Sequence, residues 1–276
     1  LALPGMAHAA DAKHCRRCGA PYVFDAIYLG HLGHYHCASC GQRRPQPSVS
    51  AGEVVLEGVR AASFTLRTPA GEGRVRLALP GLYNVYNALG AAALATALGV
   101  PLASILAGLQ STRAAFGRAE TVALSPARSG NGASGHGEAE RELQILLVKN
   151  PAGANEVLRT LALEPGKHDV LGVLNDKIAD GRDVSWVWDA DFELLAGRVA
   201  SFTCAGTRAA ELATRVKYAG VEPSRIHVQP DLRGALIEAE RRTQPGGTVY
   251  ALPTYTAMLE LRELLVSRGE LSGSWS

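Results

Sequence analysis

From residue 143 onwards, short apolar runs alternate with segments whose apolar residues recur at helical spacing. Each run is short enough to be a buried strand. Strands that alternate with amphipathic helices form βαβ units, which assemble into a parallel sheet with helices on its faces. The chain is therefore predicted to have an α/β fold with a Rossmann-like sheet. The expected strands span 143–148, 169–174, 199–204, 225–228 and 248–252, and the expected helices 152–163, 189–196, 207–219, 231–242 and 255–267.

The length and net charge of the chain limit which classes of protein it can belong to. Its 276 residues provide for one large domain or two ordinary ones. A net charge of +2 gives no electrostatic reason to expect nucleic acid or a membrane as the main partner. No apolar run approaches the roughly 18 residues of a membrane span, and residues 1–12 do not resemble a signal peptide. We expect a soluble, cytoplasmic protein and, because the first residue is Leu1, a missing N-terminal part.

Four of the five cysteines form two Cys-x-x-Cys pairs, Cys15 with Cys18 and Cys37 with Cys40, with 18 residues between the pairs. This spacing is typical of a four-thiolate zinc site. A glycine follows each pair, as in zinc knuckles, and the short apolar runs between the pairs can supply strands. Residues 1–47 are therefore predicted to form a linker and a zinc ribbon with structural Zn²⁺. Disulfides are the alternative, disfavoured because nothing indicates secretion.

The ribbon raises a second class of function. Zinc ribbons often bind nucleic acid, and four arginines flank the cysteines here: Arg16, Arg17, Arg43 and Arg44. Such arginines more often form a solvated face. A zinc-ribbon nucleic-acid-binding or regulatory protein with a Rossmann-like domain is kept as the alternative.

Residues 48 to 118 show a different pattern. Runs rich in β-branched and apolar residues at 53–59, 63–68 and 74–79, separated by glycine and proline, predict an antiparallel meander. An alanine-rich helix follows and ends at Gly99. Asn84 lies at the mouth of this helix, where its amide can both accept and donate hydrogen bonds. A simple N-cap is the alternative.

Polar clusters follow two of the expected parallel strands. Lys149-Asn150-Pro151 follows the strand at 143–148, and its proline is suited to starting a helix. Four acids and two tryptophans follow the strand at 169–174, namely Asp176, Asp180, Asp183, Asp189, Trp186 and Trp188. Open α/β sheets bind ligands at the carboxyl ends of their strands. The acidic cluster therefore predicts a ligand or partner site, and solvated capping aspartates are the alternative.

Three further segments follow strand ends. Cys204 ends one strand and is interpreted as a small core residue. Gly206-Thr207-Arg208 and Pro253-Thr254-Tyr255-Thr256 precede helices. Capping of those helices is the interpretation we favour for both, and lining of the same crevice is the alternative.

Taken together, the motifs resemble the MurT family, the Mur-ligase-like subunits of lipid II isoglutaminyl synthase. With the ribbon, the motifs that carry this resemblance are Pro80-Gly81-Leu82-Tyr83-Asn84-Val85-Tyr86-Asn87-Ala88, Gly117-Arg118-Ala119-Glu120, Lys149-Asn150-Pro151-Ala152-Gly153 and Asn175-Asp176-x3-Asp180-Gly181-Arg182-Asp183. The resemblance covers nearly the whole chain. It implies that residues 48–118 are the C-terminal part of a Mur-ligase central, ATP-binding domain that carries the four-cysteine zinc ribbon. It also implies that residues 119–276 are a Rossmann-like C-terminal domain.

The resemblance implies an enzyme, a carbon–nitrogen ligase with glutamine as the amido donor. In this family, ATP-dependent amidation of the D-glutamate α-carboxylate of lipid II gives D-isoglutamine during peptidoglycan synthesis. The ammonia comes from a separate glutaminase subunit, GatD. The implied partners are GatD and membrane-bound lipid II at the inner face of the membrane, with no nucleic acid. A folate or cyanophycin relative among the Mur-type ligases would explain Asn84 but neither the ribbon nor the Asp180 motif.

Roles for single residues also come from the resemblance. Asn84, with Asn87 as a weaker candidate, is implied to contact the adenine of ATP. Asp180 is implied to complete the Cys–His pair of the glutaminase, since a histidine base needs a carboxylate to fix its tautomer and stabilise its cation. Lys149 and Arg118 are candidates to neutralise the transferring phosphoryl group together with Mg²⁺.

One departure from the family pattern concerns the ATP phosphates. Mur ligases bind them through a glycine-rich loop, and no Gly-x4-Gly-Lys-Ser/Thr occurs in these 276 residues. We therefore expect an incomplete ATP site, and we expect these residues alone to be inactive as a ligase.

Overall fold

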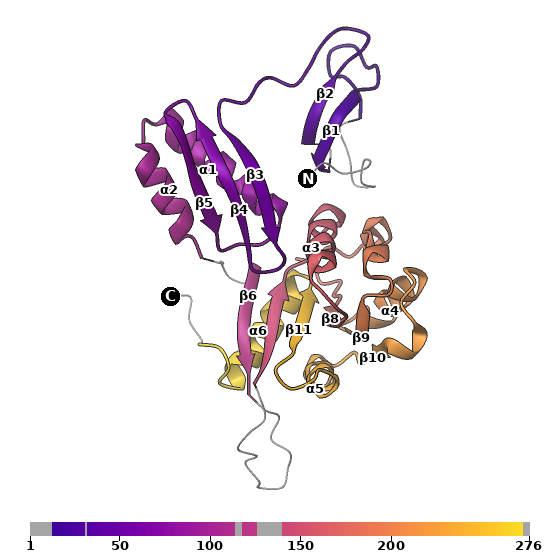
Figure 1. The fold of residues 1–276 in the computed structure, drawn as a ribbon. Coiled ribbons are helices and arrows are strands. Elements are labelled where there is room, and N and C mark those ends of the chain that lie inside the picture. Colours follow the sequence, from indigo (N-terminus) through magenta and orange to yellow (C-terminus); the bar gives the residue numbers. More distant parts are fainter. Residues whose placement is uncertain (1–12, 31, 114–117, 126–139, 273–276) are drawn as a thin grey trace. The chain divides into compact units, whose positions relative to one another are not determined.

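The computed structural model describes residues 13–30, 32–113, 118–125 and 140–272 (Figure 1). The chain divides into two compact units, Leu1–Arg113 and Ala114–Ser276. The first unit contains a two-stranded and a three-stranded sheet, the second a six-stranded sheet, and each unit has its own hydrophobic core. Among the described helices, none combines the length and the apolar character that crossing a bilayer requires.

The ribbon is a two-stranded antiparallel hairpin between the two cysteine pairs. Strand β1 (Val23–Leu29) pairs with β2 (Leu32–His36), and a register shift between Phe24 and Ala26 interrupts the pairing. The ring centroids of Tyr22 and Tyr35 lie 4.6 Å apart across the hairpin. Aromatic stacking therefore supplies part of the packing that so small a sheet lacks.

The first unit also contains the predicted meander. Strands β3 (Ser50–Glu57), β4 (Ala61–Thr68) and β5 (Gly71–Leu77) form an antiparallel sheet, on which helices α1 (Leu82–Ala97) and α2 (Leu102–Ser111) pack. Every second residue of β4 faces the helices, as expected of a sheet with one covered face. Phe64 and Leu66 of β4 are fully buried against Val85 of α1 and Ile105 of α2 in one core cluster.

The second unit is a six-stranded sheet in the order β10-β9-β8-β11-β7-β6. Its strands are β6 (Arg118–Leu124), β7 (Arg141–Leu146), β8 (His168–Val173), β9 (Val199–Ala205), β10 (Ile226–Val228) and β11 (Thr248–Pro253). The five strands predicted by the apolar runs pair in parallel, which confirms the Rossmann-like sheet. The sixth strand, β6, pairs antiparallel with β7, so the sheet is mixed at this edge.

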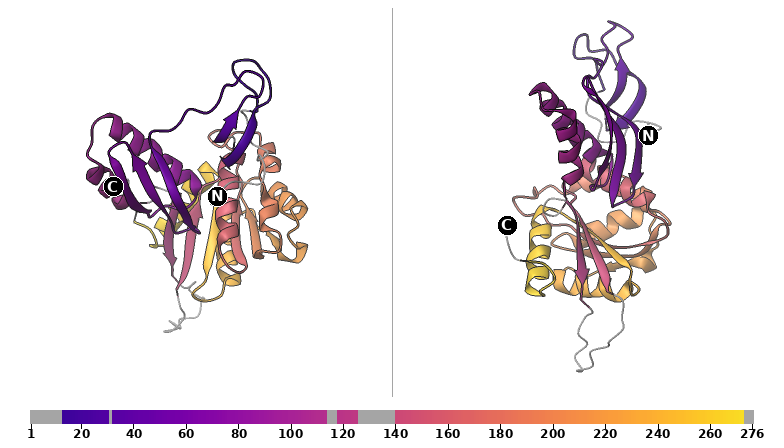
Figure 2. Two further views of the ribbon diagram at one scale, coloured as in Figure 1. Left: turned by 45° about the horizontal axis from the view of Figure 1, so that its top comes forward. Right: turned by 60° about the vertical axis from the view of Figure 1, so that its left-hand side comes forward.

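Helices cover both faces of this sheet (Figure 2). Leu171 and Val173 of β8 belong to one core cluster with residues of α5 (Leu232–Arg242) and α6 (Tyr255–Ser267). Neighbouring residues of a strand point to opposite faces. Gly172 accordingly faces Leu212 of α4 (Ala209–Tyr218), on the other side. Helix α3 (Pro151–Leu163) follows β7 and begins at Pro151 as predicted, with Asn150 as its N-cap.

The predicted helix at 189–196 is wrong. Two short 3-10 turns, η1 (Ser185–Asp189) and η2 (Phe192–Leu195), occupy this region. The backbone groups needed for a continuous helix bond to other elements instead. Arg215 donates to the carbonyl of Ala190 at 2.7 Å, and the N–H of Asp191 donates to Asn155 Oδ1 at 2.7 Å. Hydrogen bonds to distant residues thus prevent a continuous helix in a segment whose apolar spacing predicts one.

Candidate functional site

The carboxyl ends of three adjacent strands meet at Asn175. This residue follows β8, which lies between β9 and β11, and it is only 2% exposed. Its N–H donates to Thr254 Oγ1, after β11, at 3.1 Å. Its Oδ1 accepts from the N–H of Thr207, after β9, at 3.1 Å. The residue therefore ties together the sheet edge at which parallel α/β folds bind their ligands.

Thr254 occupies the N-cap position of α6, as the capping interpretation expects, whereas the N-cap of α4 is Arg208 and not Thr207. No side-chain cap bond forms at the N-terminus of either helix. The hydroxyls of Thr207 and Thr254 bond instead to the segment that follows β8. Their side-chain contacts are therefore those of the alternative interpretation, in which both residues line the strand-end crevice.

Asp180 is held by the first turn of α6. The backbone N–H of Thr256 donates to Asp180 Oδ1 at 2.8 Å, and the Thr256 hydroxyl donates to Oδ2 at 2.5 Å. The carboxylate thus satisfies an N–H that lacks a partner within the helix, at the positive end of the helix dipole. Asp180 is half-buried. Since a carboxylate can accept about four hydrogen bonds, it keeps capacity for another donor.

Asp176 has a different environment. The Thr207 hydroxyl donates to its Oδ1 at 2.7 Å, and Arg208 Nε donates to its Oδ2 at 2.8 Å. These two bonds hold the pKa of Asp176 below its ordinary range. Its charge is therefore compensated within the chain.

The two remaining acids of the cluster lie nearer the solvent. Asp183 accepts from the N–H of Ser185 at 2.8 Å in a local turn. The hydroxyl of Ser185 first, and then this N–H, lower the pKa of Asp183. Asp189 is exposed, and its side chain makes no hydrogen bond or ion pair with the described part of the chain. Asp180 differs from Asp176 because uncharged donors fix it and no salt bridge among the described residues includes it.

An ion pair lies beside Asp180. Lys177 Nζ lies 2.5 Å from Glu260 Oε1, and the same oxygen accepts from Asn175 Nδ2 at 3.3 Å. The hydrogen bond to Glu260 is the main cause of the raised pKa of Lys177. The Lys177 ammonium is therefore paired with Glu260 of α6 and forms no salt bridge with Asp180.

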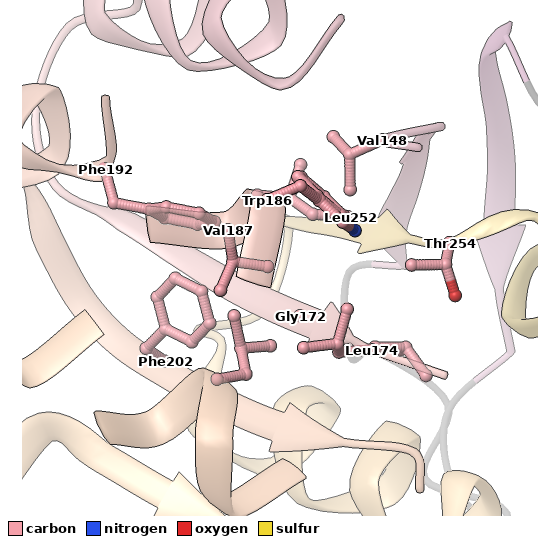
Figure 3. A pocket seen from close by; sticks show the side chains of 11 residues that line it. Val148, Gly172, Leu174, Trp186, Val187, Phe192, Phe202, Leu252 and Thr254 are labelled. Atoms are coloured by element: carbon pink, nitrogen blue, oxygen red, sulfur yellow. The ribbon is translucent and has the colours of Figure 1, made fainter. Parts of the chain in front are cut away.

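Below the loop lies a small apolar pocket (Figure 3). Trp186 and Val187 of η1 line it together with Gly172 of β8 and Phe202 of β9. A Cβ atom at Gly172 would lie 2.7 Å from side-chain atoms of Leu212 and Phe202. Any larger residue at position 172 would therefore displace the side chains of Leu212 and Phe202 on this face of the sheet.

Arg215 of α4 fixes the segment that carries the tryptophans. It is 3% exposed, and its Nε donates to the carbonyl of Val187 at 2.9 Å. Its guanidinium lies 5.5 Å from the ring centroid of Trp188 and 5.4 Å from that of Phe192, within the range of cation–π contacts. The aromatic residues of the acidic segment are thereby anchored on α4, although Trp188 remains 52% exposed.

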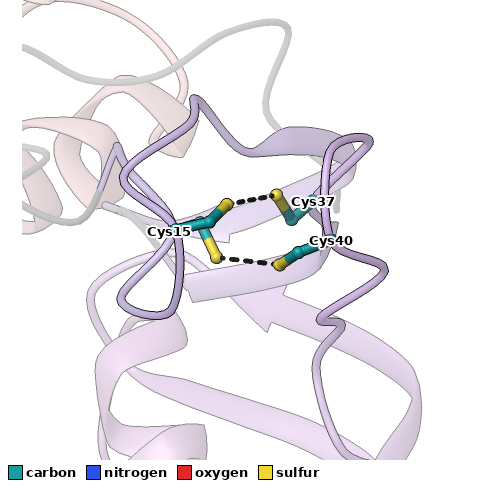
Figure 4. Close-up of side chains that lie close together, drawn as sticks. Cys15, Cys37 and Cys40 are labelled. Carbon is teal, nitrogen blue, oxygen red and sulfur yellow. Dashed lines mark hydrogen bonds between the residues drawn. The ribbon is translucent and has the colours of Figure 1, made fainter.

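The four predicted metal ligands come together in the first unit (Figure 4). Their sulfur atoms all lie within 4.8 Å of one another. Cys15 Sγ lies 3.6 Å from Cys40 Sγ, and Cys18 Sγ lies 3.5 Å from Cys37 Sγ. Four sulfurs about 2.3 Å from a tetrahedral zinc ion would be roughly 3.8 Å apart. The cluster therefore has the size and the soft donors of a site that can hold a metal ion.

Both cysteine turns have the same backbone pattern. The N–H of Gly19 donates to the Cys15 carbonyl at 2.8 Å, and the N–H of Gly41 donates to the Cys37 carbonyl at 2.9 Å. Both glycines have positive φ, 76° and 73°. Glycine adopts this conformation without steric cost, which explains its place after each pair.

Asn84 lies inside the first turn of α1 and is not the N-cap, which is Gly81. The N-cap alternative is therefore wrong. Asn84 Nδ2 donates to the carbonyl of Pro80 at 2.8 Å, and its Oδ1 accepts from Asn87 Nδ2 at 3.3 Å. The amide of Asn84 is half-buried and that of Asn87 is exposed.

Lys149 and Arg118 belong to the second unit, whereas Asn84 and Asn87 belong to the first. Lys149 is exposed between β7 and α3. Arg118 is the first residue of β6, and its side chain lies outside the described part of the structure.

Comparison with known proteins finds MurT subunits over most of the chain and UDP-N-acetylmuramate–L-alanine ligases over shorter stretches. Residues 147–258 match the family model described as MurT ligase C-terminal. Over 256 residues the chain is 33% identical to the lipid II isoglutaminyl synthase (glutamine-hydrolyzing) subunit MurT of Streptococcus pneumoniae, and it is equally similar to that of Staphylococcus aureus. Each alignment covers 92% of this chain and 53% of the relative. The chain thus spans about half the length of the curated relatives it matches.

Solved structures share the fold. A pseudomurein peptide ligase type C from Methanothermus fervidus superposes with a TM-score of 0.64 at 23% identity, over 96% of this chain and 50% of that one. MurF from Acinetobacter baumannii superposes with a TM-score of 0.59 at 24% identity, over 82% and 46%. These neighbours support the predicted α/β architecture of a Mur ligase.

Proposed function

We propose that this chain, which is 33% identical to MurT subunits over 92% of its length, acts as the ligase subunit of an ATP-dependent, glutamine-hydrolysing amidotransferase. In this proposal the enzyme converts the D-glutamate α-carboxylate of lipid II to D-isoglutamine at the inner face of the membrane. A glutaminase of the GatD type supplies the ammonia. The similarity over 92% of the chain supports this function over that of a zinc-ribbon nucleic-acid-binding protein.

The proposal depends on the hydrogen bonds and the burial of the Asp180 carboxylate. A cysteine nucleophile needs a histidine base, and the histidine needs a carboxylate that fixes its tautomer and stabilises its cation. Such a carboxylate must be held still, be free to accept one more hydrogen bond, and be within reach of the partner. Asp180 has both oxygens bonded to Thr256, is half-buried, and forms no salt bridge among the described residues. These properties support its role as the acid that completes the glutaminase site.

The nucleotide part of the proposal concerns Asn84. One N–H of its amide bonds to the carbonyl of Pro80, which leaves the second N–H for a ring nitrogen of adenine. Asn87 orients the same amide by donating to its Oδ1. Lys149 and Arg118 are proposed to assist Mg²⁺ in neutralising the phosphoryl group. The phosphate-binding loop itself is not among these residues.

The four thiols Cys15, Cys18, Cys37 and Cys40 are proposed to bind one structural Zn²⁺. Four cysteines close a tetrahedral site, so no position remains open for a catalytic water. The mutual distances of the sulfurs support this assignment. The zinc ion would stabilise the ribbon and would take no part in the ligase reaction.

The experiment that tests the function uses this chain in complex with its glutaminase. Asp180→Asn keeps the size of the side chain and one oxygen that accepts from Thr256, but removes the negative charge. We expect glutamine hydrolysis by the complex to fall by about two orders of magnitude or more. Asp183→Asn, an exposed acid of the same loop, is the matched control and retains hydrolysis. Equal hydrolysis by Asp180→Asn and the unmodified complex would remove Asp180 from the site.

A further inference from the structure

We propose that Thr256 and Asn175 are positioning residues for glutamine hydrolysis, because a hydrogen-bonded chain from Asn175 through Thr256 fixes the Asp180 carboxylate. This inference rests on the proposed role of Asp180. It adds two residues to that role, neither of which touches the glutamine or the reacting cysteine.

The hydrogen-bonded series from Asn175 to Asp180 consists of three contacts. Asn175 Nδ2 donates to Thr256 Oγ1 at 3.1 Å. The Thr256 hydroxyl donates to Asp180 Oδ2 at 2.5 Å, and the Thr256 N–H donates to Asp180 Oδ1 at 2.8 Å. Both carboxylate oxygens are thus held by one residue, which removes rotation about the last side-chain bond of Asp180.

The backbone N–H of Thr207 sets the donor and acceptor roles along the hydrogen-bonded series from Asn175 to Asp180. The N–H of Thr207 can only donate, so the atom of Asn175 that faces it must be the carbonyl Oδ1. The Nδ2 of Asn175 then faces Thr256 Oγ1 and donates to it. The hydroxyl has one proton, which is therefore directed at Asp180. Neither a flipped Asn175 amide nor a reversed hydroxyl is compatible with these contacts.

Asn175 and Thr256 are held by more contacts than Asp180. Asn175 follows β8, is 2% exposed, and bonds to Thr254 and Thr207 as well as to Thr256, which lies in the first turn of α6. Asp180 is half-buried, in the same segment between β8 and η1, and its partners among the described residues are the N–H and the hydroxyl of Thr256. A catalytic group is held to within fractions of an ångström only when residues behind it lock its rotamer. Without the hydroxyl of Thr256, one oxygen of Asp180 loses its partner, and the carboxylate can turn.

The test measures glutamine hydrolysis by the complex of this chain with its glutaminase. Thr256→Val removes the hydroxyl and keeps the shape and the backbone N–H. We expect kcat to fall by roughly tenfold or more with an unchanged KM for glutamine, because the acid acts through the histidine and not on glutamine binding. Thr256→Ser restores the hydroxyl and should return kcat to within about twofold of the original.

The pH dependence separates positioning from general damage. A carboxylate beside an imidazole raises the pKa of the imidazole. Loss of its alignment should therefore move the acid limb of the pH–rate profile to lower pH in Thr256→Val but not in Thr256→Ser. Ser201→Ala is the matched control, since it removes a hydroxyl that donates to the Asp169 carboxylate at 2.6 Å, near the amino ends of β9 and β8 and away from the site. It should leave both kcat and the profile unchanged.

The outcomes are distinguishable. If Asp180→Asn abolishes hydrolysis while Thr256→Val retains it, the positioning role is wrong and the role of Asp180 stands. If Asp180→Asn has no effect, the proposed function fails, and this inference fails with it. Equal losses in Thr256→Val and Ser201→Ala would indicate a general structural effect and overturn the inference. Should Thr256→Val not co-elute with the glutaminase, Thr256→Ala makes the same deletion with a smaller side chain.

Discussion

The side-chain amide of Asn175 lies 3.1 Å from the hydroxyl of Thr256, although the two residues are 81 positions apart in the sequence. The other end of the same amide accepts from the N–H of Thr207. These bonds join the segment after β8 to the end of β9 and to the N-terminus of α6. Because Asn175 is buried, its amide must have partners at both ends, and the strand ends supply them.

Asn175→Asp should destabilise the second unit. The carboxylate keeps an acceptor for the Thr207 N–H, but it puts a second oxygen where Nδ2 donates to Thr256 and Glu260. A buried acceptor without a donor costs about 1–3 kcal/mol, and we expect that loss in urea-induced unfolding. Asn150→Asp is the control, since aspartate serves as well as asparagine at the N-cap of α3. Equal stability of the two variants would contradict the structural role of the Asn175 amide.

Metal removal should unfold the ribbon and leave the second unit folded. Among the described residues of 13–44, the buried hydrophobic side chains are Cys15, Ile27 and Cys37, which is too small a core to be stable alone. We expect about one zinc ion per chain by elemental analysis, and loss of protection against proteolysis in this segment after chelation.

The matched pair for this prediction is Cys18→Ser and Cys204→Ala. Cys18 belongs to the cluster, whereas Cys204 is buried alone in β9, where burial raises the pKa of its thiol to about 12. Cys18→Ser should lose the zinc and Cys204→Ala should keep it. Full zinc content in Cys18→Ser would show that the four thiols are not the site.

His168 should make the second unit sensitive to acid. It is 3% exposed at the start of β8, and its Nε2 has no hydrogen-bond partner within the described residues. Burial lowers the pKa of His168. The unfolded chain therefore takes up a proton near the ordinary pKa of about 6.5, before the folded chain does. The contribution of neutral His168 to stability is complete above that pH and declines as the pH falls below it.

The charged groups that act on His168 are Glu164, Asp169 and Arg198, and burial outweighs them. Buried Glu156 and Glu240 have raised pKa values and the opposite pH dependence. The measurement is therefore the difference in urea midpoint between the unmodified chain and His168→Phe, taken at a pH about one unit above the ordinary histidine pKa and at a pH about one unit below it. The unmodified chain should lose more stability on acidification than His168→Phe, and parallel losses would contradict the assignment.

A protein made of these 276 residues should not amidate lipid II, even with its glutaminase present. No Gly-x4-Gly-Lys-Ser/Thr occurs in the sequence, so the γ-phosphoryl group of ATP lacks the loop that binds it in Mur ligases. Glutamine hydrolysis should continue, since Asp180 is present. Mass spectrometry of lipid II after incubation with glutamine and ATP measures the product, and amidation at a rate typical of such enzymes would refute the prediction.

The parallel strands and the cysteine cluster could be predicted because their signals are local. A buried strand such as β8 is a continuous apolar run, and the Cys-x-x-Cys spacing is set by the geometry of one turn. The helix start at Pro151, with Asn150 before it, followed from the proline itself. In each case the residues that determine the structure lie within a few positions of one another.

The contacts around Asp180 could not be predicted, because they join distant parts of the chain. Nothing in the sequence near Thr256 indicates that its hydroxyl and N–H bond to a residue 76 positions earlier. The same holds for the predicted helix at 189–196. Asn155 and Arg215 take up the backbone groups of this segment, and neither is close to it in sequence.

The proposed mechanism requires the Asp180 carboxylate to form part of the active site of a glutaminase partner. A structure of this chain in complex with that glutaminase would examine this contact itself. We predict that a carboxylate oxygen of Asp180 lies within hydrogen-bonding distance, about 2.6–3.2 Å, of a ring nitrogen of the catalytic histidine. Thr256 should hold the other oxygen. An Asp180 that faces away from the partner, or whose only donor is Thr256, would contradict the mechanism.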